Sequence, residues 1–259
     1  DFFTRTATAI KIMGLYLWKL MVPYPLACDY SYNQIKIVSF GDFYVLISLF
    51  VYIGLAVIAF LGFKKKSVLS FSVLFYFISM SIYSNLIITI GSSFGERFLF
   101  VPSFAFALAL AYLITKLFGM LQKEINLNQL FTSKVFLTLL PLFIIYIGIT
   151  MSRNKDWKSS LSLYEADINK SPESAHMNYY YGLEIMKGKA MENGEVTKPK
   201  YLDTAIFYFR RARTIVPSFA DAYDQLGLAY FRKNEWDKAL AYYDTCLTLA
   251  PGKSITYSN

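Results

Sequence analysis

The sequence predicts an all-α protein, in which a polytopic transmembrane helical bundle is followed by an α-solenoid of repeated helix pairs. The chain of 259 residues is 55% hydrophobic and only 17% charged, whereas an ordinary soluble domain is about 25% charged. The charges divide unevenly, with 16 charged side chains in residues 1–151 and 28 in the shorter stretch of residues 152–259. This composition excludes disorder, and it excludes a nucleic-acid partner in spite of the net charge of +8.

Residues 1–42 are expected to form an interfacial helix followed by an extracytoplasmic loop. The helix should cover residues 4–21, and it contains two aromatic residues of the kind that lie at headgroup level, Tyr16 and Trp18. Its basic residues are spread too evenly for a comfortable span: Arg5, Lys11 and Lys19. A fifth transmembrane span over the same residues is the alternative.

Residues 43–152 are expected to contain four transmembrane helices. A helix needs about 20 mostly apolar residues to cross the hydrocarbon core. Four uncharged runs meet or approach this length: residues 43–63, 67–95, 98–115 and 135–152. Since lipid offers the backbone no hydrogen bonds, these runs should be helices rather than strands.

The basic residues of the short loops predict the orientation of this bundle. Three consecutive lysines at residues 64–66 follow the first run, and Lys123 and Lys134 precede the fourth. Because basic loops stay in the cytoplasm, the turn at Glu96 and Arg97 and everything after residue 152 should lie outside it.

Residues 153–259 are expected to be tetratricopeptide repeats (TPRs). Three prolines each follow a large apolar residue by 15 positions, and the last two are 34 residues apart, which is the period of this repeat: Pro172, Pro217 and Pro251. They predict a half repeat over residues 156–172, a repeat over 175–217 with an insertion between its helices, and a repeat over 221–251.

Stacked repeats of this kind form a concave groove, which we expect to bind protein or glycan. The residues expected to face it are His176, Tyr179, Asp221, Asp224 and Phe231. The alternative is that the repeats only pack against the membrane half.

The chemistry of ordinary soluble enzymes is not evident in this sequence. One histidine and two cysteines are too few for a Cys/His zinc site, and the sequence has neither a phosphate-binding glycine loop with its lysine nor a nucleophile elbow. We therefore predict no metal site and no bound cofactor in this chain, and we assign no catalytic residue.

The remaining candidates are polar residues at the outer membrane face. Arg97, oriented by Glu96, could hold the phosphate of a lipid carrier through bidentate hydrogen bonds, or the two could be a simple ion pair at a helix end. In a loop with two prolines, Asp29 and Tyr30 could bind a sugar or orient Arg97. A purely structural role for this loop is the alternative.

Three short motifs precede or lead into the repeats in a fixed order: Pro23-Tyr24-Pro25-Leu26-x-x-Asp29-Tyr30, Gly95-Glu96-Arg97-Phe98-Leu99-Phe100-Val101-Pro102-Ser103, and Arg153-Asn154-x-Asp156-Trp157. In this order they resemble the transmembrane-and-TPR-containing (TMTC-like) O-mannosyltransferase family and its bacterial homologues, which belong to the GT-C class. The resemblance covers most of the chain. It implies transfer of a sugar from a polyprenyl-phosphate carrier to a serine or threonine of a protein or peptide acceptor held by the TPRs. It also implies an integral protein of a bacterial inner membrane, in contact with membrane lipid and with periplasmic repeats.

The GT-C class keeps its key acidic residues in the first extracytoplasmic loop. We expect this chain, which begins at Asp1 rather than Met, to be a fragment without that loop, so the catalytic base and any divalent metal contact lie outside it. Two other functions fit the same residues. One is a lipid-linked oligosaccharide ligase or polymerase with a TPR tail, and the other is a membrane-tethered TPR scaffold without catalysis.

Overall fold

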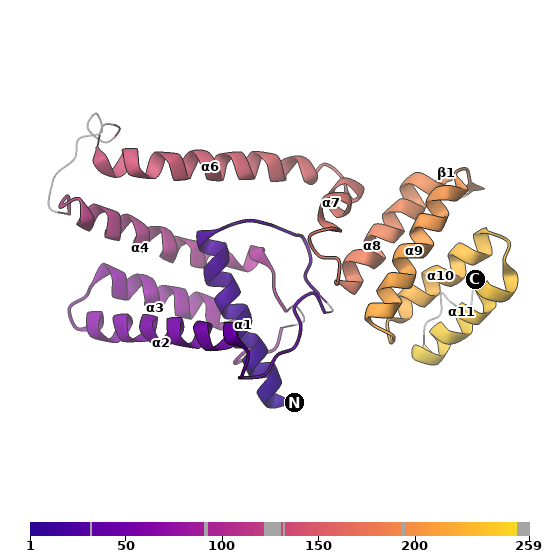
Figure 1. The fold of residues 1–259 in the computed structure, drawn as a ribbon, viewed down its shortest axis with the longest axis horizontal. Helices are drawn as coiled ribbons and strands as arrows, with labels where there is room; N and C mark the ends of the chain where they lie inside the picture. The colour runs from indigo at the N-terminus through magenta and orange to yellow at the C-terminus, as the bar shows by residue number, and fades with distance from the viewer. Residues whose placement is uncertain (32, 91–92, 122–130, 132, 193–194, 253–259) are drawn as a thin grey trace. The chain divides into compact units, whose positions relative to one another are not determined.

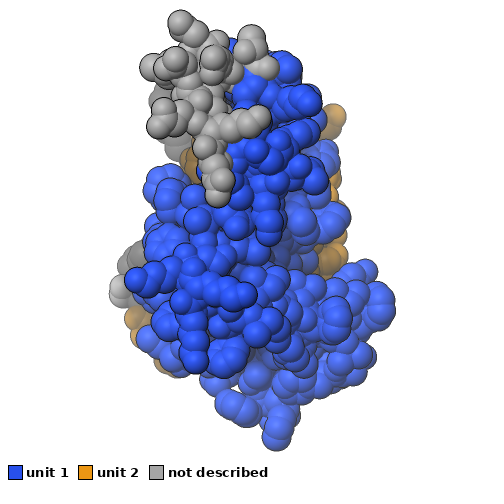
Figure 2. Space-filling model, turned by 90° about the vertical axis from the view of Figure 1, so that its left-hand side faces the viewer, with its two compact units in different colours: residues 1–24, 37–155 blue, residues 25–36, 156–259 orange. Residues whose placement is uncertain are grey.

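A computed structural model describes the chain except for residues 32, 91–92, 122–130, 132, 193–194 and 253–259, so Lys123 lies outside the described residues. The chain forms two compact units, which Figure 2 shows in different colours. The first unit comprises residues 1–24 and 37–155, and the second comprises residues 25–36 and 156–259. Apart from two strands of two residues each, the described regular structure is helical, which confirms the predicted all-α class.

The first unit is built from long apolar helices (Figure 1). Its described elements are α1 (Phe2–Met21), α2 (Phe43–Phe63), α3 (Val68–Ser81), the 3-10 helix η1 (Glu96–Leu99), α4 (Pro102–Leu117) and α6 (Lys134–Asp156). Helix α2 packs against α3, and α3 packs against α4. In Figure 1, α1 crosses the end of α2 at a steep angle. The choice between an interfacial helix and a fifth span for α1 stays a prediction.

Two of the four apolar runs form helices that are long and apolar enough to cross a bilayer, α2 and α6. The other two form shorter helices, and α3 has only 14 residues, a rise of about 21 Å against a hydrocarbon core of about 30 Å. The run of residues 67–95 is therefore not one helix. It turns at Asn85, which has a positive φ of 56° and whose Oδ1 accepts a hydrogen bond from the Ile90 N–H at 2.9 Å.

Close packing of small and hydroxyl-bearing residues joins the first three helices. The Tyr52 hydroxyl on α2 donates to the Met13 carbonyl on α1 at 3.0 Å and lies 2.7 Å from the Tyr76 hydroxyl on α3. The Ser70 hydroxyl donates to the Ala59 carbonyl at 2.6 Å. Such contacts are typical of helices that associate within a membrane, where burial of apolar surface gives little driving force.

The crossing of α1 and α2 depends on Gly14. A Cβ at this position would lie 1.9 Å from the Ser48 hydroxyl oxygen and 2.9 Å from the Ser48 Cβ. We expect Gly14→Ala to destabilise the first unit by about 1–3 kcal/mol because the helices must separate. The double variant Gly14→Ala with Ser48→Gly moves the small residue to the facing helix and should recover most of this loss. Thermal unfolding in detergent measures both, and a double variant no more stable than Gly14→Ala would contradict this packing.

The second unit contains the repeats (Figure 1). Its described elements are α7 (Ser160–Asp167), α8 (Ala175–Ile185), the π-helix η2 (Met186–Ala190), the antiparallel strands β1 (Met191–Glu192) and β2 (Glu195–Val196), α9 (Pro199–Ile215), α10 (Ala220–Arg232) and α11 (Trp236–Leu249). Helices α8 and α9 pack as one pair and α10 and α11 as the next.

Both pairs use the same contact between a glycine and an aromatic ring. A Cβ at Gly182 would lie 2.9 Å from the Phe209 ring, and a Cβ at Gly227 would lie 2.5 Å from the Tyr243 ring. The two rings are 34 residues apart and the two glycines 45 apart. The additional 11 residues lie between α8 and α9, at the position of the predicted insertion, where the described elements are η2, β1 and β2.

Candidate functional site

The first candidate site is the turn that contains Arg97 and Glu96. It is held against α1, because the Gly95 N–H donates a hydrogen bond to the buried Tyr16 hydroxyl at 3.2 Å. The Phe94 ring lies 4.5 Å from the Tyr16 ring, measured between centroids. One turn further along α1, Lys19 lies within electrostatic range of the Glu96 carboxylate. The turn therefore brings an acidic residue and two basic residues to one end of α1.

Arg97 is the exposed member of this turn. Its guanidinium carbon lies 5.1 Å from the centroid of the Phe98 ring, and the Phe98 ring stacks on Tyr83 at 4.6 Å. A guanidinium above an aromatic face is oriented by the ring but keeps its N–H donors available. This geometry suits the binding of a phosphate.

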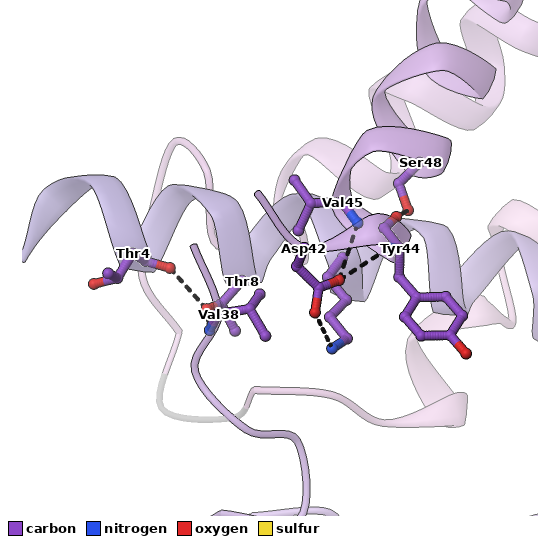
Figure 3. Close-up of polar contacts among 8 residues, drawn as sticks. Thr4, Thr8, Val38, Asp42, Tyr44, Val45 and Ser48 are labelled. Atoms are coloured by element: carbon purple, nitrogen blue, oxygen red, sulfur yellow. Dashed lines mark hydrogen bonds and ion pairs between the residues drawn. The ribbon is translucent and has the colours of Figure 1, made fainter. Parts of the chain in front are cut away.

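Asp42 caps the N-terminus of α2, where it also contacts α1 (Figure 3). Its carboxylate accepts hydrogen bonds from the backbone N–H groups of Tyr44 and Val45, and it pairs with Lys11 Nζ at 3.3 Å. Desolvation alone would raise the pKa of the Asp42 carboxyl, but the Lys11 contact and the two backbone bonds together lower it below its ordinary value. Asp42 is thus an ionised cap of α2, and we assign it a structural role.

Asp29 and Tyr30 lie in the second unit, within a segment of residues 25–36 that we call the strap. The Asp29 carboxylate accepts hydrogen bonds from the Ser31 N–H at 2.9 Å, the Ser31 hydroxyl at 2.6 Å and the Ser174 hydroxyl at 2.7 Å. The Tyr30 hydroxyl accepts one from the Ala27 N–H at 3.2 Å. These contacts hold Asp29 and Tyr30 within the second unit, and their predicted roles in binding a sugar or orienting Arg97 stay predictions.

The strap is fixed to the first helices of the repeat unit at two further points. The Cys28 N–H donates to the Asp167 carboxylate at 2.8 Å, and the Glu173 N–H donates to the Gln34 side chain at 2.9 Å. Asp167 is completely buried and pairs with Lys170 at 2.8 Å. The predicted half repeat of residues 156–172 contains α7, and these two bonds join the strap to the last residue of α7 and to the turn that follows.

Four of the five predicted groove residues come together on α8 and α10. The His176 and Tyr179 rings lie 5.3 Å and 5.2 Å from the Phe219 ring. Asp221 acts electrostatically on both His176 and Tyr179, and Asp224 acts on Tyr179. Desolvation by burial raises the pKa of Tyr179, and the nearby acidic groups raise it further, so its hydroxyl stays protonated.

Phe231 does not belong to this cluster. Its ring packs edge-on against Trp236 at 5.0 Å, at the turn between α10 and α11. The groove cluster of the described structure therefore comprises His176, Tyr179, Asp221, Asp224 and the aromatic neighbours Tyr180 and Phe219, which the sequence did not single out.

We expect His176 to make the stability of the repeat unit depend on pH. Burial lowers its pKa below the ordinary value of 6.5, although the Asp29 and Asp221 carboxylates oppose this shift. The unfolded chain therefore takes up a proton before the folded chain does as the pH falls, so stability is lost below about pH 6.5 and is unaffected by this group above it. We expect the thermal midpoint to fall less between pH 7.5 and 5.5 in His176→Gln than in the wild type. Equal falls would show that His176 does not carry this dependence.

Comparison with known proteins shows what this chain is similar to. Residues 220–253 match the tetratricopeptide repeat model, which agrees with the predicted repeat over 221–251. Protein O-mannosyl-transferase TMTC1 of Mus musculus is 26% identical over 231 residues, covering 86% of this chain and 23% of that protein. Protein O-mannosyl-transferase TMTC3 of Mus musculus is 25% identical over 254 residues, covering 96% of this chain and 25% of that protein.

The chain is therefore similar to protein O-mannosyl-transferases over most of its length. Over a shorter stretch of 96 residues, it is 34% identical to protein O-mannosyl-transferase tmtc2 of Xenopus laevis. These matches confirm the family resemblance that the three motifs predicted. The chain spans about a quarter of the length of the curated relatives TMTC1 and TMTC3.

Sequence reasoning missed Tyr16 and Lys19 as parts of the Arg97 turn. Their spacing of three residues places them on one face of α1, but the residue on which that face packs is far away in the sequence. The described residues contain no cluster of three or more His, Cys, Asp or Glu side chains that could hold a metal ion.

Proposed function

We propose that the full-length protein is an integral-membrane glycosyltransferase that transfers a sugar from a polyprenyl-phosphate carrier to a protein acceptor recruited by its TPRs. The observation that carries this proposal is the similarity to protein O-mannosyl-transferases over 96% of the chain, which includes both the apolar helical unit and the repeats. Because the chain spans about a quarter of those relatives, we assign no catalytic base to any of its residues.

In this proposal the turn at Arg97 binds the phosphate of the lipid carrier. Arg97 offers N–H donors in a planar fork that matches phosphate oxygens, and Lys19 adds a second positive charge nearby. The negative charge of Glu96 offsets part of this positive charge, so the site attracts anions in general less strongly. The buried pair of Tyr16 and Phe94 fixes the turn, so that little conformational freedom is lost on binding.

The repeats hold the acceptor in the groove cluster. Aromatic rings provide flat surfaces for an extended peptide, and the exposed carboxylate of Asp221 favours segments with basic residues. The groove and the Arg97 turn lie in different units, so acceptor binding and donor binding can be separated by mutation. We further propose that both face the periplasm of a bacterial inner membrane, as the basic loops predict.

Analysis of the product tests this proposal against the two alternatives. The purified full-length protein should attach a single sugar to serine or threonine of an acceptor protein when it is supplied with a polyprenyl-phosphate sugar. A ligase would transfer a preassembled glycan from a lipid diphosphate, and a scaffold would transfer neither. Mass spectrometry of the acceptor distinguishes the three outcomes.

A further inference from the structure

We propose that the first unit binds an anionic glycerophospholipid in a cavity at the turn between α2 and α3. The cavity has a volume of about 730 Å³. Its lining residues are Phe63, Lys64, Lys66, Ser67, Val68, Ser70, Phe71, Leu74 and Leu108. It lies at the opposite end of α3 from the segment that leads to the Arg97 turn, so it is separate from the donor site proposed above and does not rest on sugar transfer.

The positive charge of the lining residues favours an anionic ligand in this cavity. Two of its lining residues are lysines, and a third lysine, Lys65, lies between them in the sequence. The sequence has no acidic residue between Asp42 and Glu96, nor any within α4, which supplies Leu108. No carboxylate of α2, α3 or α4 can therefore neutralise the two lysines that line the cavity.

The backbone N–H groups at the start of α3 add hydrogen-bond donors that also favour an anion. Ser67 is the N-cap residue of α3, and its side chain makes no capping hydrogen bond in the described structure. The first N–H groups of a helix and its dipole both attract anions. A phosphate at the cavity mouth would meet these donors together with the ammonium groups of Lys64 and Lys66.

The rest of the cavity is apolar, which favours a lipid over a free anion as the ligand. Phe63, Val68, Phe71, Leu74 and Leu108 come from three helices and form its wall. Free phosphate gains nothing from these side chains, whereas the acyl chains of a lipid can pack against them. Basic pockets between membrane helices commonly take anionic headgroups, and the cytoplasmic leaflet, where residues 64–66 are predicted to lie, is the one rich in such lipids.

The backbone of Lys66 supplies a sharp test. Its φ is +49°, and the Lys66 and Ser67 N–H groups donate to the Phe63 and Gly62 carbonyls at 3.0 and 3.1 Å. Glycine is the usual residue at this position of a helix end, because it adopts a positive φ without strain. Lys66→Gly therefore removes a lining charge from the cavity while it relieves the backbone, and it should fold at least as well as the wild type.

The experiment uses the full-length protein in mild detergent, with dioleoyl phosphatidylglycerol added in one arm and dioleoyl phosphatidylcholine in another. Native mass spectrometry should show retention of phosphatidylglycerol in preference to phosphatidylcholine, and only phosphatidylglycerol should raise the thermal midpoint. Lys66→Gly should weaken phosphatidylglycerol binding about fivefold without lowering the midpoint of the lipid-free protein. Lys65→Gln removes the same charge from a residue that does not line the cavity, and it should stay within about twofold of the wild type by the same reasoning.

Three outcomes would overturn the proposal. The first is equal retention of the two lipids. The second is an equal loss of binding in Lys65→Gln and Lys66→Gly, which would show a general effect of surface charge. The third is full competition by inorganic phosphate at the concentration of the lipid, which would show a free-anion site without a role for the apolar wall.

Discussion

If Arg97 binds the donor phosphate as proposed, Arg97→Ala is expected to lower sugar transfer by roughly 10- to 100-fold, since a hydrogen bond to a charged group contributes about 1.5–3 kcal/mol and each 1.4 kcal/mol is tenfold. The side chain is exposed, and the described contact of its guanidinium is with the face of Phe98, so the fold should be unaffected. Arg97→Lys keeps the positive charge but loses the planar guanidinium, so its transfer rate should lie between those of the wild type and Arg97→Ala. The measurement is the initial rate of transfer from a polyprenyl-phosphate sugar.

Arg5→Ala is the matched control for this variant. Arg5 is also an exposed arginine of the first unit, and its guanidinium carbon lies 5.4 Å from the Phe2 ring centroid. Its contact geometry is thus close to that of Arg97, but it lies at the opposite end of α1 from Lys19. Transfer should be unchanged in Arg5→Ala. Equal rates in Arg97→Ala and Arg5→Ala would remove Arg97 from the donor site.

Phe209→Ala is expected to destabilise the repeat unit by about 3–5 kcal/mol, because it removes a completely buried ring and leaves a cavity. The ring fills the space beside Gly182, where α8 and α9 approach most closely. Since domains are stable by only about 5–15 kcal/mol in total, α8 and α9 should become accessible to exchange. Hydrogen exchange of their amides in the full chain measures this loss locally.

Phe207→Ala gives the matched control on the same helix. The Phe207 side chain is 56% exposed, so its removal should change stability by no more than about 0.5 kcal/mol. If Phe209→Ala increased exchange no more than Phe207→Ala, the contact of Phe209 with Gly182 would not be the core of this repeat.

The repeats were the most predictable part of the fold. The 34-residue period and the prolines locate the ends of α9 and α11, because each proline follows the last turn of its helix. The insertion was also visible, since it interrupts that period. The aromatic character of Phe209 and Tyr243 and the small size of Gly182 and Gly227 together predict a close contact between two helices.

The apolar half was less predictable, because hydropathy does not detect turns within an apolar run. Residues 67–95 lack charges, yet α3 ends at Ser81, and a serine- and asparagine-containing turn follows it. Side chains such as Ser84 and Asn85 bond to nearby backbone and compete with the helix. This local chemistry shortens the helix without altering the mean hydropathy.

The strap and the Arg97 turn depend on contacts that a single sequence does not reveal. Asp29 bonds to a residue 145 positions away, and Cys28 to one 139 positions away. The Tyr16 hydroxyl meets Gly95 across 79 residues. A short motif indicates that a residue matters, but it does not show which residues far away in the sequence that residue contacts.

The most direct test of the proposed function is transfer by the reconstituted full-length protein. It should be supplied with polyprenyl-phosphate-linked mannose, the sugar that the names of its relatives specify, and with a purified acceptor protein. The expected result is a single mannose on serine or threonine, formed by the wild type and by Arg5→Ala and strongly reduced in Arg97→Ala. Transfer of a preassembled glycan, or no transfer from a polyprenyl-phosphate sugar by a folded, lipid-reconstituted protein, would contradict it.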